Sequence, residues 1–238
     1  MARIGFIQTR GIGDIVIALP IAAAFSEAGH SVFWPVDAAW VPFLRPAAPY
    51  VEFLEVPSKA ELRDYYVGIP RALLKQARCD AVHMLYSQLR LEGEKVQEEK
   101  LAKFLKFDEY KYAVTGVPFA RKWDLQLGRD LEREEELFRS LDVGEEPYIC
   151  IHRLGSEAGF EVRLDPEWTR QYKIVEIDER TDSPFDWLTT LERAAKILCI
   201  DSCFSNLVEQ LNWPNEKYLF LRNQGFSTPV LKNGWRFL

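Results

Sequence analysis

Strand-like and helix-like segments alternate along most of the chain, and this alternation restricts its fold more than any other feature. Short runs rich in β-branched and aromatic residues are followed by stretches with helical spacing of apolar residues. Such alternation predicts an α/β fold with parallel sheets and helices on their faces. The predicted strands span residues 3–8, 31–36, 51–56 and 81–85 in the first half, and 148–152, 173–177, 197–200 and 218–221 in the second.

A charged middle segment, followed by a linker, predicts two domains. The charged segments 94–107 and 129–141 are interpreted as amphipathic helices with solvated faces. Residues 142–147, with a glycine and a proline, resemble a linker, so the domains are expected at 1–145 and 146–238. The remaining predicted helices span 14–28, 71–77, a segment from the Ser-Pro start at 183–184 to about 195, and one that opens at 201–202.

Composition excludes several classes of protein. The 238 residues are 47% hydrophobic and carry a net charge of −6, which is typical of a globular protein and argues against a nucleic-acid-binding domain. The longest apolar run, residues 15–25, is too short to cross a membrane, and no signal segment opens the chain, so a cytoplasmic protein is expected. The four cysteines and three histidines show no metal-ligand spacing, so no metal is expected.

The first predicted strand-to-helix junction contains Gly11, Gly13 and Asp14. Glycines there let a ligand approach the backbone, and helix N-terminal amides favour negative charge. An alternative is the dinucleotide fingerprint of an NAD(P)-dependent oxidoreductase, with Asp37 as the ribose-binding acid. Val16 occupies the third glycine position of that fingerprint, and the Asp14 carboxylate would repel a pyrophosphate. A purely structural alternative makes Asp14 the helix cap, a role that Asn fills equally well.

The second such junction carries polar residues from a strand into a helix. Free backbone amides at the helix start, together with a serine hydroxyl, could hold a diphosphate. The structural alternative is that Asp201 or Ser202 only caps the helix. The polar or thiol-bearing residues of this junction are Asp201, Ser202, Cys203, Ser205 and Asn206.

Three segments in the same order resemble the heptosyltransferase family of lipopolysaccharide glycosyltransferases. Residues 12–20, with Gly-Asp at a helix start and a proline further on, resemble its N-terminal motif. Residues 148–152 resemble the strand that opens its donor-binding domain, and 186–202 resemble the helix and strand that lead into its Asp-Ser-Gly-Pro-x-His motif. The resemblance implies a GT-B architecture, in which two Rossmann-like domains face one another across a cleft.

The same resemblance implies metal-independent, inverting transfer of a sugar from a nucleotide-sugar donor to a saccharide or other hydroxyl acceptor, with no cofactor. Asp14 would be the base, so Asp14→Asn should slow transfer by about 10²- to 10⁴-fold and preserve the helix start. Arg10, Gly11 and Gly13 would form the acceptor-side loop. The expected donor-diphosphate site comprises Asp201, Ser202, Cys203, Ser205, Asn206, His152 and Arg153, with Arg163 as a further cation and Glu176 and Asp178 near the ribose.

Two departures from the family motif keep a second function open. Cys203 and Phe204 replace its Gly-Pro, and Asn206 stands where the family has His. A non-catalytic nucleotide- or sugar-binding protein of the same fold is therefore the alternative to an enzyme. The sequence leaves the sugar, the nucleotide base and the acceptor undetermined.

Overall fold

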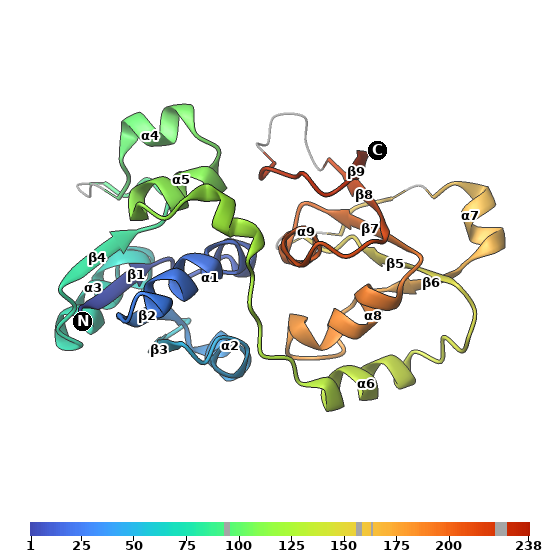
Figure 1. The fold of residues 1–238 in the computed structure, drawn as a ribbon, viewed down its shortest axis with the longest axis horizontal. Helices are drawn as coiled ribbons and strands as arrows, with labels where there is room; N and C mark the ends of the chain where they lie inside the picture. The colour runs from blue at the N-terminus through green and yellow to red at the C-terminus, as the bar shows by residue number, and fades with distance from the viewer. Residues whose placement is uncertain (93–95, 156–158, 163, 222–227) are drawn as a thin grey trace. The chain divides into compact units, whose positions relative to one another are not determined.

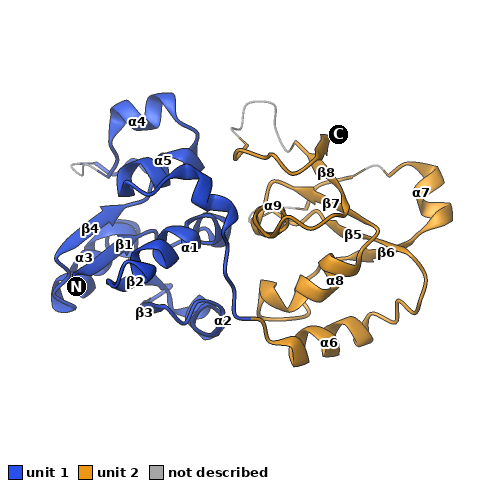
Figure 2. Cartoon of the chain, viewed as in Figure 1, with its two compact units in different colours: residues 1–128 blue, residues 129–238 orange. Residues whose placement is uncertain are grey.

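The chain folds into two compact units, Met1–Gly128 and Arg129–Leu238 (Figure 2). The structure is a computed structural model that describes residues 1–92, 96–155, 159–162, 164–221 and 228–238 (Figure 1). Each unit is a mixed α/β structure with its own parallel sheet. Within the described part of the chain, no helix is both long and apolar enough to span a bilayer.

The sheet of the first unit has the strand order β3-β2-β1-β4, and all its strand pairs are parallel. β1 is central: Ile4 pairs with Val32 of β2 on one side and with Ala81 of β4 on the other. The carboxyl ends of β1 and β4 therefore form the topological switch point, where open α/β sheets bind ligands. The strands are β1 Arg3–Ile7, β2 Ser31–Asp37, β3 Val51–Val56 and β4 Ala81–Met84.

Helices cover this sheet, and the first of them is buried on all sides. It begins after Gly11, whose positive φ of 86° suits glycine, and its residues from Ile15 to Ala23 are buried. It packs against the sheet as well as against α5 and η3, which explains why it lacks a polar face. The helices of this unit are α1 Ile12–Glu27, η1 Ala38–Trp40, α2 Val41–Ala47, η2 Asp64–Gly68, α3 Ile69–Gln76, α4 Glu99–Phe104, α5 Phe107–Thr115 and η3 Phe119–Trp123.

The sheet of the second unit has the order β6-β5-β7-β8-β9, again with parallel pairs only. Its switch point lies between β5 and β7, where His152 pairs with Cys199. The strands are β5 Tyr148–His152, β6 Lys173–Glu176, β7 Lys196–Ile200, β8 Glu216–Phe220 and β9 Trp235–Phe237. The helices are α6 Leu131–Ser140, α7 Pro166–Gln171, η4 Pro184–Trp187, α8 Leu188–Arg193 and α9 Cys203–Leu211.

The helix expected over 94–107 is wrong. Residues 93–95 lie outside the described part; α4 covers Glu99–Phe104, and a second helix, α5, begins at Phe107. Leu105 and Lys106 are extended between them, and the Lys106 N–H donates to the Glu109 carboxylate at 2.9 Å, which starts the new helix. Phe104, an apolar residue of this segment, is 80% exposed.

The boundary between the compact units differs from the expected one at 145/146, because α6 belongs to the second unit. Two nitrogens of the Arg129 guanidinium donate to the buried Glu134 carboxylate, and Thr189 donates to the same carboxylate at 2.7 Å. Arg133 bonds the buried Asp186 at 2.7 Å. These contacts attach α6 to η4 and α8, so the unit begins at Arg129.

Candidate active site

The loop after β1 lies at the switch point of the first unit, and other elements hold its backbone in place. Trp34 Nε1 donates to the Gln8 carbonyl at 3.1 Å, and the Thr9 N–H donates to the Tyr86 hydroxyl at 2.6 Å. The Asp37 N–H donates to the Thr9 carbonyl at 3.1 Å. The loop is thus fixed from β2 and from the segment after β4.

Gly11 is required where the loop turns into α1. Besides its positive φ, a Cβ at this position would lie 2.7 Å from Asp14 Oδ2. Gly13 is the second residue of the helix, and Asp14 is the third. The exposed Arg10 follows the buried Thr9, and its carbonyl accepts a hydrogen bond from Gln8 Nε2 at 2.7 Å.

Asp14 is an ion-pair partner and does not cap the helix, because Gly11 occupies the cap position. Its Oδ1 lies 2.9 Å from Lys111 Nζ; the lysine side chain is 1% exposed and that of Asp14 is 36% exposed. Lys111 also donates to Gln8 Oε1 at 2.9 Å and to the Leu85 carbonyl at 3.0 Å. A solvent-accessible carboxylate is therefore anchored at the ligand-binding edge of the sheet.

Asp37 does not have the surroundings of a ribose-binding acid. It is buried, and it accepts hydrogen bonds from Ser58 Oγ at 2.5 Å, Tyr65 Oη at 2.6 Å and the Ala39 N–H at 2.9 Å. Burial opposes ionisation, yet these hydrogen bonds and the charge of Arg10 hold the pKa of Asp37 below its usual value. The acid on which the dinucleotide alternative depends is occupied by structural contacts.

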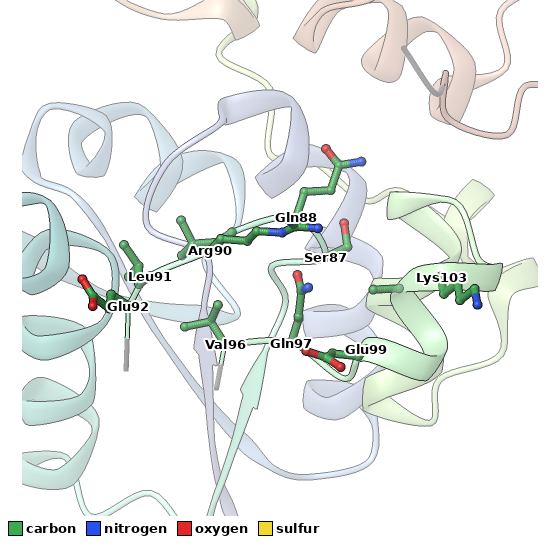
Figure 3. A pocket seen from close by; sticks show the side chains of 11 residues that line it. Ser87, Gln88, Arg90, Leu91, Glu92, Val96, Gln97, Glu99 and Lys103 are labelled. Atoms are coloured by element: carbon green, nitrogen blue, oxygen red, sulfur yellow. The ribbon is translucent and has the colours of Figure 1, made fainter. Parts of the chain in front are cut away.

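A pocket of about 900 Å³ follows β4, and nothing in the sequence pattern indicates it. It lies between the loop after the strand and α4 (Figure 3). Tyr86, directly before this loop, is the residue that accepts the Thr9 N–H, so the pocket wall is tied to the loop that leads into α1, the helix of Asp14. The lining is mainly polar: Ser87, Gln88, Leu89, Arg90, Leu91, Glu92, Val96, Gln97, Glu99, Ala102 and Lys103.

The start of α9 lies at the switch point of the second unit, directly after Asp201. Ser202 is the N-cap residue, and its N–H donates to Ser205 Oγ at 3.0 Å. The Ser202 hydroxyl oxygen and Asn206 Oδ1 are buried, and neither has a hydrogen-bond partner among the described residues. Asn206 Nδ2 donates to the Ser202 carbonyl at 2.9 Å, so at this helix N-terminus it is the two oxygens that a ligand could engage.

Two other predicted residues adjoin this helix start. The His152 ring ends β5 and lies 4.6 Å from the Phe204 ring, centroid to centroid. Burial raises the pKa of the Cys203 thiol to about 12, so the thiol is neutral at physiological pH. Because a neutral thiol adds no negative charge, Cys203 is compatible with an anion at this position.

The remaining expected donor-side residues that the structure describes form ion pairs. The Arg153 guanidinium forks onto the Glu176 carboxylate at 2.6 and 2.8 Å. Asp178 is paired with Arg180 at 2.6 Å. Arg163 lies outside the described residues. In the part of the chain that the structure describes, no group of three or more His, Cys, Asp or Glu side chains could hold a metal ion.

Sequence comparison finds no matching family model and no matching curated protein. Structural comparison is more informative: the chain has the fold of heptosyltransferase-like glycosyltransferases, with mixed α/β units on parallel sheets. This agrees with the resemblance carried by the sequence motifs.

Three solved structures illustrate the likeness. A glycosyl transferase of family 9 from Veillonella parvula is 14% identical, with a TM-score of 0.62 over 100% of this chain and 85% of the other. The ADP-heptose lipopolysaccharide heptosyltransferase II of E. coli is 12% identical, with a TM-score of 0.60 over 100% and 90%. The dodecameric iron-containing heptosyltransferase TibC, solved with ADP-D-β-D-heptose, is 16% identical, with a TM-score of 0.55 over 96% and 61%.

Proposed function

We propose that the protein is a glycosyltransferase that moves a sugar from a nucleotide-sugar donor to a hydroxyl acceptor without a metal ion. The first unit would supply the acceptor side, the second would bind the donor, and the two would meet across a cleft as in GT-B enzymes. One observation carries the proposal: in a glycosyltransferase fold, the partly exposed carboxylate of Asp14 is anchored at the carboxyl edge of the first sheet.

The pocket after β4 is the proposed acceptor site. Its lining includes two positive and two negative side chains, Arg90, Lys103, Glu92 and Glu99, together with amide and hydroxyl groups. Gln97 Oε1 is buried and has no hydrogen-bond partner among the described residues, so a hydroxyl group of a ligand would satisfy it. These groups suit a hydroxyl-rich acceptor such as a saccharide.

The start of α9 is the proposed diphosphate site. The N-terminal end of α9 favours an anion, and the Ser202 hydroxyl can donate to a phosphate oxygen. Arg153 would add a cation after β5, and His152 would border the site. Asn206 Oδ1 is an acceptor and suits a hydroxyl group of the donor.

In the proposed reaction, the acceptor hydroxyl transfers its proton to Asp14 Oδ2, the oxygen that Lys111 does not bind. The acceptor oxygen forms a bond to the anomeric carbon from the face opposite the leaving group, which inverts the configuration. The bond between that carbon and the phosphate oxygen breaks, and its electron pair leaves with the nucleoside diphosphate. Helix amides, Ser202 and Arg153 stabilise the departing negative charge.

The donor that we would test first is an ADP-sugar. One of the similar structures is an ADP-heptose lipopolysaccharide heptosyltransferase, and another was solved in complex with ADP-D-β-D-heptose. Glu176 and Asp178 remain proposed ribose contacts; each would have to exchange an arginine partner for a ribose hydroxyl.

Non-catalytic nucleotide-sugar binding is the second candidate, and the replacement of Gly-Pro by Cys203 and Phe204 favours it. Both candidates predict that ADP and ADP-heptose raise the melting temperature, because a ligand that binds only the folded state stabilises it. A thermal-shift panel of nucleoside diphosphates, nucleotide sugars and NAD, with and without EDTA, tests this. We expect shifts with ADP and ADP-heptose that persist in EDTA, and none with NAD.

Failure of every nucleotide to shift the melting temperature would contradict the donor site. A shift that EDTA abolishes would contradict metal-independent binding. Release of ADP from ADP-heptose, with the heptosyl group passing to water or to an added saccharide, then separates an enzyme from a binding protein, because only the enzyme turns the donor over.

A further inference from the structure

Lys111 is almost completely buried beside the first turn of α1, which carries Asp14, and three acceptors surround its ammonium group. Its three N–H donors face three acceptors: Asp14 Oδ1 at 2.9 Å, Gln8 Oε1 at 2.9 Å and the Leu85 carbonyl at 3.0 Å. These acceptors come from α1, from the loop after β1 and from the end of β4. The ammonium therefore has one well-defined position relative to the switch point.

The contact uses only one of the two oxygens of Asp14. Lys111 binds Oδ1, whereas Oδ2 lies over Gly11, where a Cβ would approach it to 2.7 Å. Oδ2 takes no hydrogen bond from any described residue, and the Asp14 side chain is 36% exposed. The ion pair thus fixes the carboxylate and leaves its second oxygen available to a ligand.

We propose that Lys111 is a positioning residue that holds the Asp14 carboxylate in one orientation, with Oδ2 toward the acceptor hydroxyl; this rests on the proposed glycosyl transfer. Orientation matters because a misplaced base loses much of its effectiveness.

The chain offers a matched control in Lys122. Its ammonium lies 2.7 Å from Asp108 in the same unit, and both side chains are fully buried. Asp108 has no exposed surface and cannot meet a substrate directly, whereas Asp14 is accessible. Lys122→Met therefore tests what the loss of a buried lysine does to the fold, without altering the Asp14 contact.

The experiment is a double-mutant cycle on the release of ADP from ADP-heptose, with water as the acceptor. The variants are Asp14→Asn, Lys111→Met, the two combined, and Lys122→Met, all assayed well below their melting temperatures. We expect Lys111→Met to slow release about 10- to 100-fold in the wild-type background, with unchanged ADP affinity. In the Asp14→Asn background it should change the rate less than about two-fold, since the group it positions is gone. Lys122→Met should lower the melting temperature and keep the wild-type rate.

Equal losses from Lys111→Met in both backgrounds, or equal losses from Lys111→Met and Lys122→Met, would overturn the positioning role. If Lys111→Met fails to fold, Gln8→Met removes one acceptor of the ammonium and keeps both charges. It should slow release only when Asp14 is present. If Asp14→Asn slows ADP release and Lys111→Met does not, the role of Lys111 alone is overturned. If Asp14→Asn releases ADP at the wild-type rate, the proposed base and this inference are overturned together.

Discussion

The guanidinium of Arg153 and the carboxylate of Glu176 form a two-point contact at the carboxyl ends of β5 and β6, with Nε–Oε1 at 2.6 Å and Nη2–Oε2 at 2.8 Å. Both residues are predicted ligand contacts, and in the structure each is the partner of the other. The side chains are 43% and 40% exposed, so solvent screens the pair. A donor phosphate could therefore replace the carboxylate at little energetic cost.

Glu176→Gln should release Arg153 and raise the affinity for ADP. A surface pair contributes about 0–1 kcal/mol, so the expected gain is up to about five-fold, with little change in the melting temperature. Arg153→Ala should weaken ADP binding by a larger factor. Isothermal titration measures both.

The control for this pair is Glu135→Gln, which breaks the contact of Glu135 with Arg193 on the surface of the same unit. ADP affinity should not respond to it. A Glu176→Gln variant whose affinity falls would instead support Glu176 as a ribose contact and contradict the competition between the two partners.

Ser202→Ala should weaken ADP binding by about 1–2 kcal/mol, the contribution of a charge-assisted hydrogen bond. Its free energy of unfolding should be unchanged or slightly higher, because the buried hydroxyl oxygen has no partner among the described residues. Ser205→Ala is the matched variant: its hydroxyl bonds the Ser202 N–H and carbonyl at 3.0 and 2.9 Å, so its loss should destabilise α9. A destabilised Ser202→Ala with normal ADP affinity would make Ser202 only a cap.

Asp37→Asn should destabilise the first unit by about 1–3 kcal/mol at pH 7, since the amide cannot accept all the hydrogen bonds of the carboxylate. The folded-state pKa of Asp37 is lowered, so this carboxylate contributes stability above its unfolded value of 3.8 and loses it as pH falls through the folded value. Denaturation of both proteins from pH 7 down to pH 3 should show the difference shrinking below about pH 4. A difference that is independent of pH would contradict the assignment to the ionised group.

Both parallel sheets are predictable from the sequence because their central strands are continuous apolar runs. β5 and β7 are buried along their whole length, as expected of strands covered on both faces. The glycine and helix-start residues at the two junctions likewise predict where each sheet binds ligands. These features are local, and local sequence is sufficient to indicate them.

Lys111 could not be predicted, because its burial depends on tertiary contacts. Its partner Gln8 is 103 residues away, and a lysine in a charged segment is ordinarily solvated. One local feature indicates that a helix begins shortly before Lys111. Glu109 follows Lys106 by three residues, a spacing typical of a helix start. The surroundings of Asp37 could not be predicted for a similar reason: Ser58 and Tyr65, which donate hydrogen bonds to it, follow 21 and 28 residues later.

Asp14→Asn is more than the replacement of a helix cap, so its stability is expected to change. Because Asp14 is the counter-ion of a lysine that is 1% exposed, the amide leaves a buried ammonium without a compensating charge. The melting temperature should therefore fall, and it should recover when Lys111→Met is added. Calorimetry of the single and double variants measures this coupling.

The rate of ADP release from ADP-heptose in wild type and Asp14→Asn tests the central claim most directly. We expect measurable release by the wild type and a rate about 10²- to 10⁴-fold lower in the variant. Both proteins are assayed at a temperature where they are folded and bind ADP equally. Equal rates in the two proteins, or tight binding of ADP-heptose with no release by either, would contradict a transferase in which Asp14 is the base.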